Sequence, residues 1–98
     1  MVLCVLIVEL YFPENGSLKE KRQFIRSIKD KVRSSFNISV AEVDYHELWQ
    51  RSKLAFVCVG VDKASAEEVI KGVIKLLDKH YPEFILDMRV DYIKPTLA

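Results

Sequence analysis

Hydrophobic and polar residues follow two different periods along this chain, and the order of those periods predicts its architecture. Four stretches are continuously apolar or alternate with a period of two, which is typical of β-strands. They are residues 2–12, 37–45, 54–61 and 84–93. Two stretches, residues 17–36 and 65–80, repeat apolar positions every three to four residues, which is typical of amphipathic helices. The predicted order is β-α-β-β-α-β.

Capping and turn signals support these boundaries. Ser17 with Glu20, and Ser65 with Glu68, have the spacing of a capping box, so each serine is predicted to begin a helix. Pro82 is expected to end the second helix, and Pro95 the last strand.

Two split β-α-β units in this order predict a ferredoxin-like plait of the α+β class, formed as one domain over residues 1–98. Right-handed crossovers would place both helices on one face of a four-stranded antiparallel sheet in the order 4-1-3-2. The two wholly apolar strands, 2–12 and 54–61, would then lie in the centre of the sheet. Because helices cover only one face, the apolar residues on the other face require another cover. We expect a homodimer formed through this open sheet face.

The helix at residues 17–36 carries a concentrated positive charge. Five of its basic residues fall within an arc of roughly 80° when successive residues are turned by about 100°; they are Lys19, Arg22, Arg26, Lys29 and Arg33. With seven basic and two acidic residues, the helix has a net charge of +5 in a chain of net charge +1. Such a stripe predicts a site for a phosphate backbone or for an acidic protein, and the alternative is a solvated helix face.

The segment 44–51 is too long for a tight hairpin and is rich in functional groups. Trp49 offers a surface on which a base can stack, and Arg51 a bidentate phosphate donor. Alternatively, Leu48 and Trp49 fold back to close the end of the core or fill a dimer contact. A histidine general base at His46, oriented by Asp44 or Glu47, is conceivable. The segment offers no convincing nucleophile or oxyanion donor, so we expect no enzymatic activity.

Several other classes of site are not expected. The chain has no C-x-x-C pair, P-loop or G-x-G-x-x-G motif, so neither a metal nor another cofactor is predicted. An RNA-recognition motif would need exposed aromatic residues on its central strands, and only Phe56 could serve. The near-neutral net charge argues against a protein that coats nucleic acid indiscriminately, and no DNA partner is expected.

Two further features concern the compartment. The apolar run at the start has no basic region before it, no cleavage site after it, and too few residues to span a membrane. Cys4 and Cys58 lie inside apolar strands and are expected to be buried and free. These features predict a cytoplasmic protein without a membrane segment.

Three motifs in order resemble the YlxP-like family of small bacterial proteins: SLKEKR at residues 17–22, AEVD at 41–44 and LWQR at 48–51. The matching positions are Ser17, Lys19, Lys21, Arg22, Asp44, Trp49, Gln50 and Arg51. The resemblance extends to about Val90. It implies a ferredoxin-like fold without an established activity. Genes of this family often lie near those for a translation initiation factor and ribosome-binding factor A, which suggests an RNA-linked role.

The residues and the resemblance together predict a non-enzymatic RNA- or ribosome-associated binding protein. The five basic residues of the helix would contact phosphates, and Trp49 and Arg51 would add local recognition. The alternative is a homodimeric module that binds an acidic protein partner. A third hypothesis is a small hydrolase that uses the loop at residues 44–51.

Overall fold

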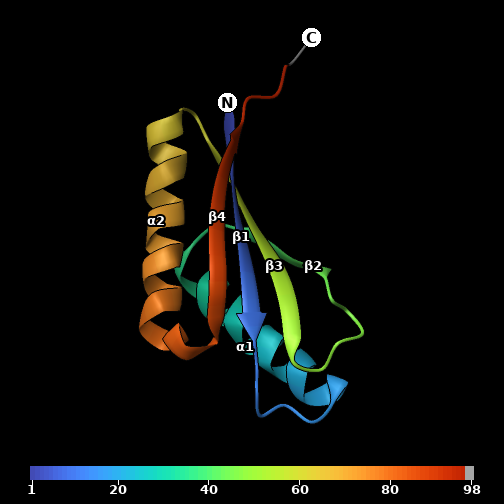
Figure 1. Cartoon of the computed structure of the whole chain (residues 1–98). Helices are drawn as coiled ribbons and strands as arrows, with labels where there is room; N and C mark the ends of the chain where they lie inside the picture. The colour runs from blue at the N-terminus through green and yellow to red at the C-terminus, as the bar shows by residue number, and fades with distance from the viewer. Residues whose placement is uncertain (97–98) are drawn as a thin grey trace.

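The structure, a computed structural model, describes residues 1–96 of the chain. The elements follow the predicted order (Figure 1). They are β1 (Val2–Tyr11), α1 (Leu18–Ser35), β2 (Ser39–Asp44), β3 (Arg51–Gly60), α2 (Lys63–His80), a 3-10 turn (Pro82–Phe84) and β4 (Ile85–Ile93).

The four strands form one antiparallel sheet in the order β2-β3-β1-β4, which is the predicted order read from the other edge. Both helices pack against the same face of the sheet, so α1 lies behind the strands in Figure 1. Residues Ile25, Ile28 and Val32 of α1, and Ile70, Val73 and Leu77 of α2, are buried in the core they share with the sheet. The predicted ferredoxin-like fold is confirmed.

The start of α2 differs from the prediction. Asp62, not Ser65, caps the helix, and its carboxylate accepts a hydrogen bond from the backbone N–H of Ser65 at 2.8 Å. Ser65 instead occupies the third helical position and accepts a bond from the Asp62 N–H at 3.4 Å. A carboxylate at this position also interacts favourably with the helix dipole, which explains why the aspartate prevails over the serine. Hydrogen bonding from the backbone, and next from the side chain, of Ser65 lowers the pKa of Asp62.

The two faces of the sheet differ in burial. Along β1, even-numbered residues are buried under the helices, whereas odd-numbered ones remain partly exposed. The same alternation continues in β3, where Val59 is 66% exposed. Among residues 1–96 no helix covers the open face, so the cover that the sequence leads us to expect there has to come from outside these residues.

The predicted apolar side of β4 is only partly in the core. Met88 and Tyr92 pack against it, whereas Leu86 and Val90 are exposed. The pairing register of β1 with β4 shifts between Glu9 and Leu10, opposite Leu86. Such an irregularity changes the direction of the side chains next to it.

The two cysteines lie directly opposite each other on β1 and β3, both buried and free as predicted. Burial raises the pKa of both thiols, and the Cys58 charge adds to the effect at Cys4. This pair contributes packing on the helix side of the sheet.

Candidate nucleic-acid interface

The five basic residues form a continuous stripe along α1, the basic stripe (Lys19, Arg22, Arg26, Lys29 and Arg33). Their spacing of three and four residues places them on one side of the helix, next to the buried side that carries Ile25, Ile28 and Val32. Four of the five are exposed, and Lys29 is half-buried. From Lys19 to Arg33 the helix rises roughly 21 Å, which is long enough to meet several successive phosphates.

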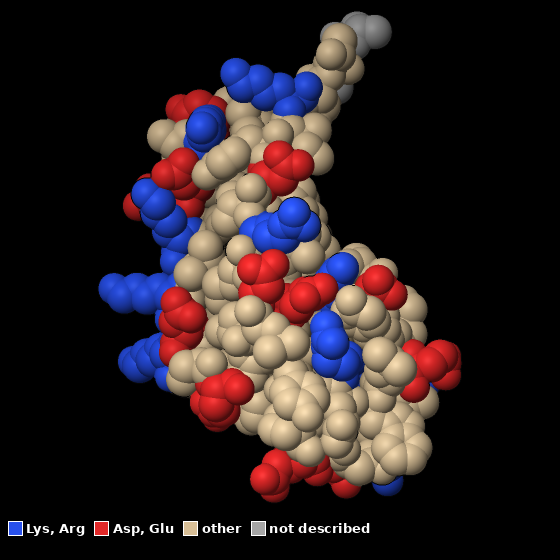
Figure 2. Space-filling model, in the orientation of Figure 1, with Lys and Arg blue, Asp and Glu red and all other residues tan. Residues whose placement is uncertain are grey.

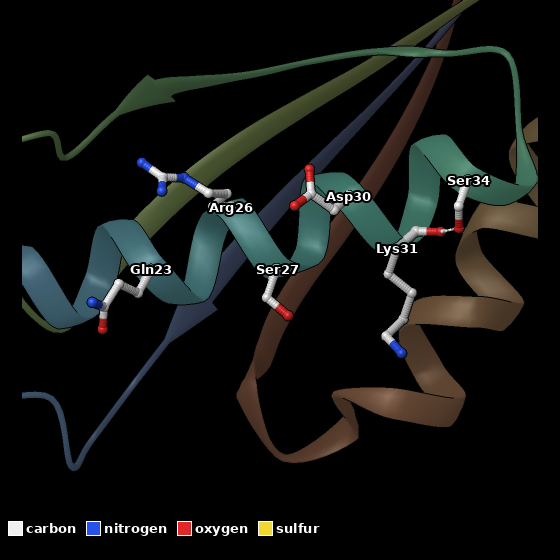
Figure 3. A pocket seen from close by; sticks show the side chains of 6 residues that line it. All are labelled: Gln23, Arg26, Ser27, Asp30, Lys31 and Ser34. Carbon is white, nitrogen blue, oxygen red and sulfur yellow. Dashed lines mark hydrogen bonds between the residues drawn. The ribbon is translucent and has the colours of Figure 1, made fainter.

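Four members of the stripe line one groove. It lies between α1 and the edge strand β2, has a volume of about 370 Å³, and is bounded by Arg22, Arg26, Lys29 and Arg33 together with Asp30 and Glu42. Figure 3 shows Arg26 and Asp30 extending from α1 toward β2. Arg33 also reaches β2 and donates to the carbonyl of Val40 at 3.4 Å. The stripe therefore faces a concave surface.

The cations of this groove have few acidic partners. Among residues 1–96, no stripe side chain takes part in an ion pair. The Glu42 carboxylate at the groove is held by other groups: Lys21 at 3.1 Å, His46 at 2.9 Å and the hydroxyl of Ser52 at 2.6 Å. Asp30 is the remaining acid in the groove. The charge of the stripe is thus available to an external anion.

A second depression on α1 does not converge on a site. Gln23, Ser27, Lys31 and Ser34 line it together with Arg26 and Asp30. In Figure 3 these side chains diverge, with Arg26 and Asp30 directed toward β2 and Lys31 toward α2. Diverging side chains cannot surround one ligand, so this is the solvent side of the helix.

Lys21 lies next to the stripe but has a different role. It is 1% exposed, and its Nζ donates to the carbonyls of Tyr45 at 2.7 Å, Arg51 at 3.2 Å and His46 at 3.3 Å, besides pairing with Glu42. The lysine therefore anchors the loop between β2 and β3 to the first turn of α1, at the N-terminal end of the stripe. Sequence reasoning missed this role. Lys21 falls in one series with Ile25, Ile28 and Val32, and this helical spacing would have revealed its burial.

Glu42 completes this anchor. Burial alone would raise the pKa of its carboxyl, but hydrogen bonds from Ser52, His46 and Lys21, with the Lys21 charge, hold that pKa below its usual value. A charged Glu42 is therefore the form present at neutral pH.

The loop differs from the arrangement proposed for catalysis. His46 is oriented by Glu42 rather than by Asp44 or Glu47, and its ring is 60% exposed. Asp44 instead accepts from the backbone N–H of Tyr45 at 2.8 Å, where Tyr45 has a left-handed backbone with φ of 64°. The carboxylate partner of His46 is thus neither of the two considered from the sequence, because Asp44 caps the turn and Glu42 contacts the imidazole.

Trp49 and Leu48 do not close the core. They are 54% and 46% exposed. The end of the core is filled by four other aromatic rings, with centroids 4.7 to 5.9 Å apart: Phe12, Phe24, Tyr81 and Phe84. Gln50 fixes the loop from the other side, because its amide donates to the carbonyls of Pro13 and Asn15 at 3.0 and 3.3 Å. Trp49 thus remains available on an anchored loop.

Arg51 is separated from the stripe. It is the first residue of β3 rather than a loop residue, and it pairs with Tyr11 on the open face of the sheet. Its guanidinium lies 4.8 Å from the centre of the Tyr45 ring and 3.8 Å from the Glu9 carboxylate. The stripe, in contrast, lies on the helix side, so the local recognition expected of Arg51 stays a prediction and would involve a different surface. Arg51 lies on the open face because β3 begins at residue 51, earlier than predicted.

Two other features are absent from the part of the chain that the structure describes. Residues 1–96 contain no group of three or more His, Cys, Asp and Glu side chains that could hold a metal ion. In the same residues, no helix is long and apolar enough to cross a membrane.

Comparisons with solved structures show the fold. A protein of unknown function from Nitrosomonas europaea (NE2512) is 12% identical with a TM-score of 0.58, and the match covers 100% of this chain and 93% of that one. The designed protein Foldit4 is 13% identical with a TM-score of 0.55, covering 97% and 98%. SnoaB, a cofactor-independent oxygenase from Streptomyces nogalater, is 5% identical with a TM-score of 0.55, covering 98% and 95%. At such identities only the architecture is shared.

Sequence comparisons show the family. The uncharacterized protein YlxP of Bacillus subtilis is 34% identical over 68 residues, which are 69% of this chain and 73% of that protein. The model of the protein family of unknown function DUF503 matches residues 3–90. The predicted resemblance to the YlxP-like family is confirmed, and the chain belongs to the DUF503 family.

Proposed function

We propose that this protein binds RNA through the basic stripe of α1, without catalysing a reaction. The observation that carries the proposal is the groove between α1 and β2, which is lined by four cations that form no ion pair among residues 1–96. A phosphate backbone supplies a row of negative charges that such a row of cations can neutralise.

The distribution of charge supports a polyanion as the ligand. The helix carries seven of the 15 basic residues and two of the 14 acidic ones, so its net charge is +5 and the rest of the chain is −4. An anionic ligand is therefore attracted to one side of the molecule and repelled by the other. Such a field orients the ligand before contact.

The other RNA-binding surface common in this fold is absent from the described residues. Phe56, the one aromatic residue considered for base stacking on the central strands, is 0% exposed and lies under the helices. The open face of β1 and β3 carries aliphatic residues at its centre. The exposed Trp49 is the better stacking group, because Lys21 holds its loop at the end of the stripe.

We further propose that the RNA is single-stranded or lies in loops, where bases are free to stack on Trp49. The setting we propose is the cytoplasm, where the two free thiols persist in the reduced form. Ribosomal RNA is one source that fits this setting. An acidic protein as the partner of the stripe is the competing outcome that the experiment below separates.

The test is a titration of a fluorescently labelled 20-nucleotide RNA, read by anisotropy. The variant Arg22→Gln, Arg26→Gln, Lys29→Gln should bind about 10- to 100-fold more weakly, because three charged contacts of roughly 0.5–1 kcal/mol each are lost. A matched control, Lys75→Gln, Lys79→Gln, Lys94→Gln, removes three exposed lysines outside α1 and should bind within about threefold of the unmodified protein.

Two results would contradict the proposal. If the unmodified protein shows no saturable RNA binding, the stripe has another ligand. If the stripe variant and the control lose affinity equally, binding depends on net charge and not on the groove. Trp49→Ala should weaken binding by a further factor of about 5 to 100, since each stacked base contributes roughly 1–3 kcal/mol.

A further inference from the structure

The open face of the sheet is an apolar surface that no helix of residues 1–96 covers. Its central residues are aliphatic and come from the two middle strands: Leu3, Val5, Ile7, Ala55, Val57 and Val59. These strands pair directly, so Leu3 lies opposite Val59, Val5 opposite Val57, and Ile7 opposite Ala55. Ile93 of β4 pairs with Leu3 and extends the patch. Val59 and Ile93 are 66% and 45% exposed.

We propose that this face binds a second copy of the chain, with the two sheets face to face and the two-fold axis parallel to the strands. The basic stripe lies on the helix side of the sheet. Dimerisation through the open face therefore leaves two stripes exposed, and this inference does not depend on the proposed RNA binding.

The charges around the patch fit a second copy better than a partner of one sign. On the open face, the four strands carry four acids and three bases: Glu9, Asp44, Asp87, Asp91, Arg51, Lys53 and Arg89. Figure 2 views this side and shows red and blue side chains interspersed on a tan surface. A balanced face complements itself, whereas a strongly acidic or basic partner would meet like charges.

The same charges select the orientation. Arg89 lies near the middle of β4, with Asp87 and Asp91 on either side of it on the same face. An axis perpendicular to the strands would place β4 over β4, so that Arg89 meets its own copy and Asp87 meets Asp91. Like charges directly opposed destabilise an interface.

An axis parallel to the strands has fewer like-charge contacts. It places β4 over the β2–β3 half of the partner, and it keeps each residue at the same level along the strands. At the level of Glu9, Asp87 then faces a like charge, the partner's Asp44, whereas Glu9 faces an opposite charge, the partner's Lys53. Arg89 faces the partner's neutral Ala41 instead of its own copy, and the aliphatic centres of the two sheets remain in contact.

The area of the face is sufficient for a dimer. Four strands spaced about 4.8 Å apart, with roughly 30 Å of paired length, present about 600 Å² each. Two copies would bury about 1,200 Å² in total, which is at the lower end for specific protein–protein interfaces. We therefore expect a dimer that dissociates at low micromolar concentrations or below.

The first test is the molar mass in solution by light scattering from 1 to 100 µM. The unmodified chain should approach twice 11.4 kDa at the upper end of this range. Val57→Glu should be monomeric, because a buried carboxylate would face the partner's aliphatic centre. Gln23→Glu, which adds the same charge on the solvent side of α1, should remain dimeric. A monomer at 100 µM, or a Val57→Glu dimer with native circular dichroism, would overturn the proposal.

The second test reports the orientation even if Val57→Glu does not fold. Arg89 and Ala41 lie at the same level of the sheet, since Ile7 pairs with Arg89 and with Ala55, which in turn pairs with Ala41. An Arg89→Cys chain mixed with an Ala41→Cys chain should be joined by a short bismaleimide. Arg89→Cys alone should not be joined to itself. Efficient self-linking of Arg89→Cys, or failure of the mixed pair to link, would contradict the proposed axis.

Discussion

Lys21 and Arg22 are neighbours on α1 and carry the same charge, but their surroundings are opposite. Lys21 is 1% exposed and bonded to three carbonyls and a carboxylate, whereas Arg22 is exposed and lines the groove beside β2. The helical period is the cause, because one step of about 100° moves a side chain from the covered side of the helix to the open one. The comparison shows that basic residues in one short motif can divide into an anchor and a binding surface.

The largest expected effect separates the two residues by stability. Lys21→Met should lower the free energy of unfolding by about 3 kcal/mol, because it leaves Glu42 as a half-buried charge without its cation and three carbonyls without their donor. Arg22→Met should change it by less than about 0.5 kcal/mol. Urea unfolding followed by circular dichroism measures both, and equal losses would show that Lys21 is no anchor.

The next effect tests the acidic half of the anchor. Glu42→Gln should cost about 1–2 kcal/mol at pH 7, since the neutral amide cannot replace the ion pair with Lys21. The lowered pKa of Glu42 means that the unfolded chain binds this proton more readily. The stability that charged Glu42 contributes is therefore fully present above the usual pKa of 4.5. It is lost as the pH falls below 4.5 and through the lower pKa of the folded chain. Unfolding at pH 7 and pH 3 should show the variant and the unmodified protein converging at the lower pH, and a constant difference would contradict this assignment.

A smaller effect concerns the other attachment of the loop. Gln50→Ala removes two exposed hydrogen bonds to Pro13 and Asn15 and should cost about 1 kcal/mol. Because Lys21 still holds the loop, Trp49 should keep its environment. Its fluorescence maximum should move less in Gln50→Ala than in Lys21→Met, and the opposite ranking would make Gln50 the main anchor.

The smallest effect is expected on the stripe itself. Replacing Arg22, Arg26 and Lys29 by Gln should change the free energy of unfolding by no more than about 0.5 kcal/mol, since none of the three is ion-paired among the described residues. Thermal and urea unfolding check this. A loss above about 2 kcal/mol would assign these residues to the fold.

The fold could be predicted from the sequence because its signals are local and agree with one another. Alternation marks the strands, helical spacing marks α1 and α2, and the two patterns permit few topologies. The error at the start of α2 arose because Asp62 and Ser65 both have capping chemistry, and the choice depends on where the chain leaves β3.

The candidate site could be predicted only where it is local. The basic stripe needs nothing beyond the helical period, and it was found. Lys21 was missed because its partners, Tyr45, His46 and Arg51, are 24 to 30 residues away. The side of the sheet taken by Arg51 depends on where β3 begins, and a loop of uncertain length leaves that open.

The central claim is that the basic stripe of α1 binds a phosphate backbone. The salt dependence of RNA affinity tests this claim most directly. Dissociation constants for a labelled single-stranded RNA would be measured between about 50 and 200 mM salt, a range over which counterion release changes the affinity strongly. Five phosphate contacts predict a slope of log Kd against log salt of about 3.5, and loss of Arg22, Arg26 and Lys29 should reduce it to about 1.4. The Lys75, Lys79 and Lys94 control should retain the full slope. Identical slopes for the unmodified protein and the stripe variant would contradict the account.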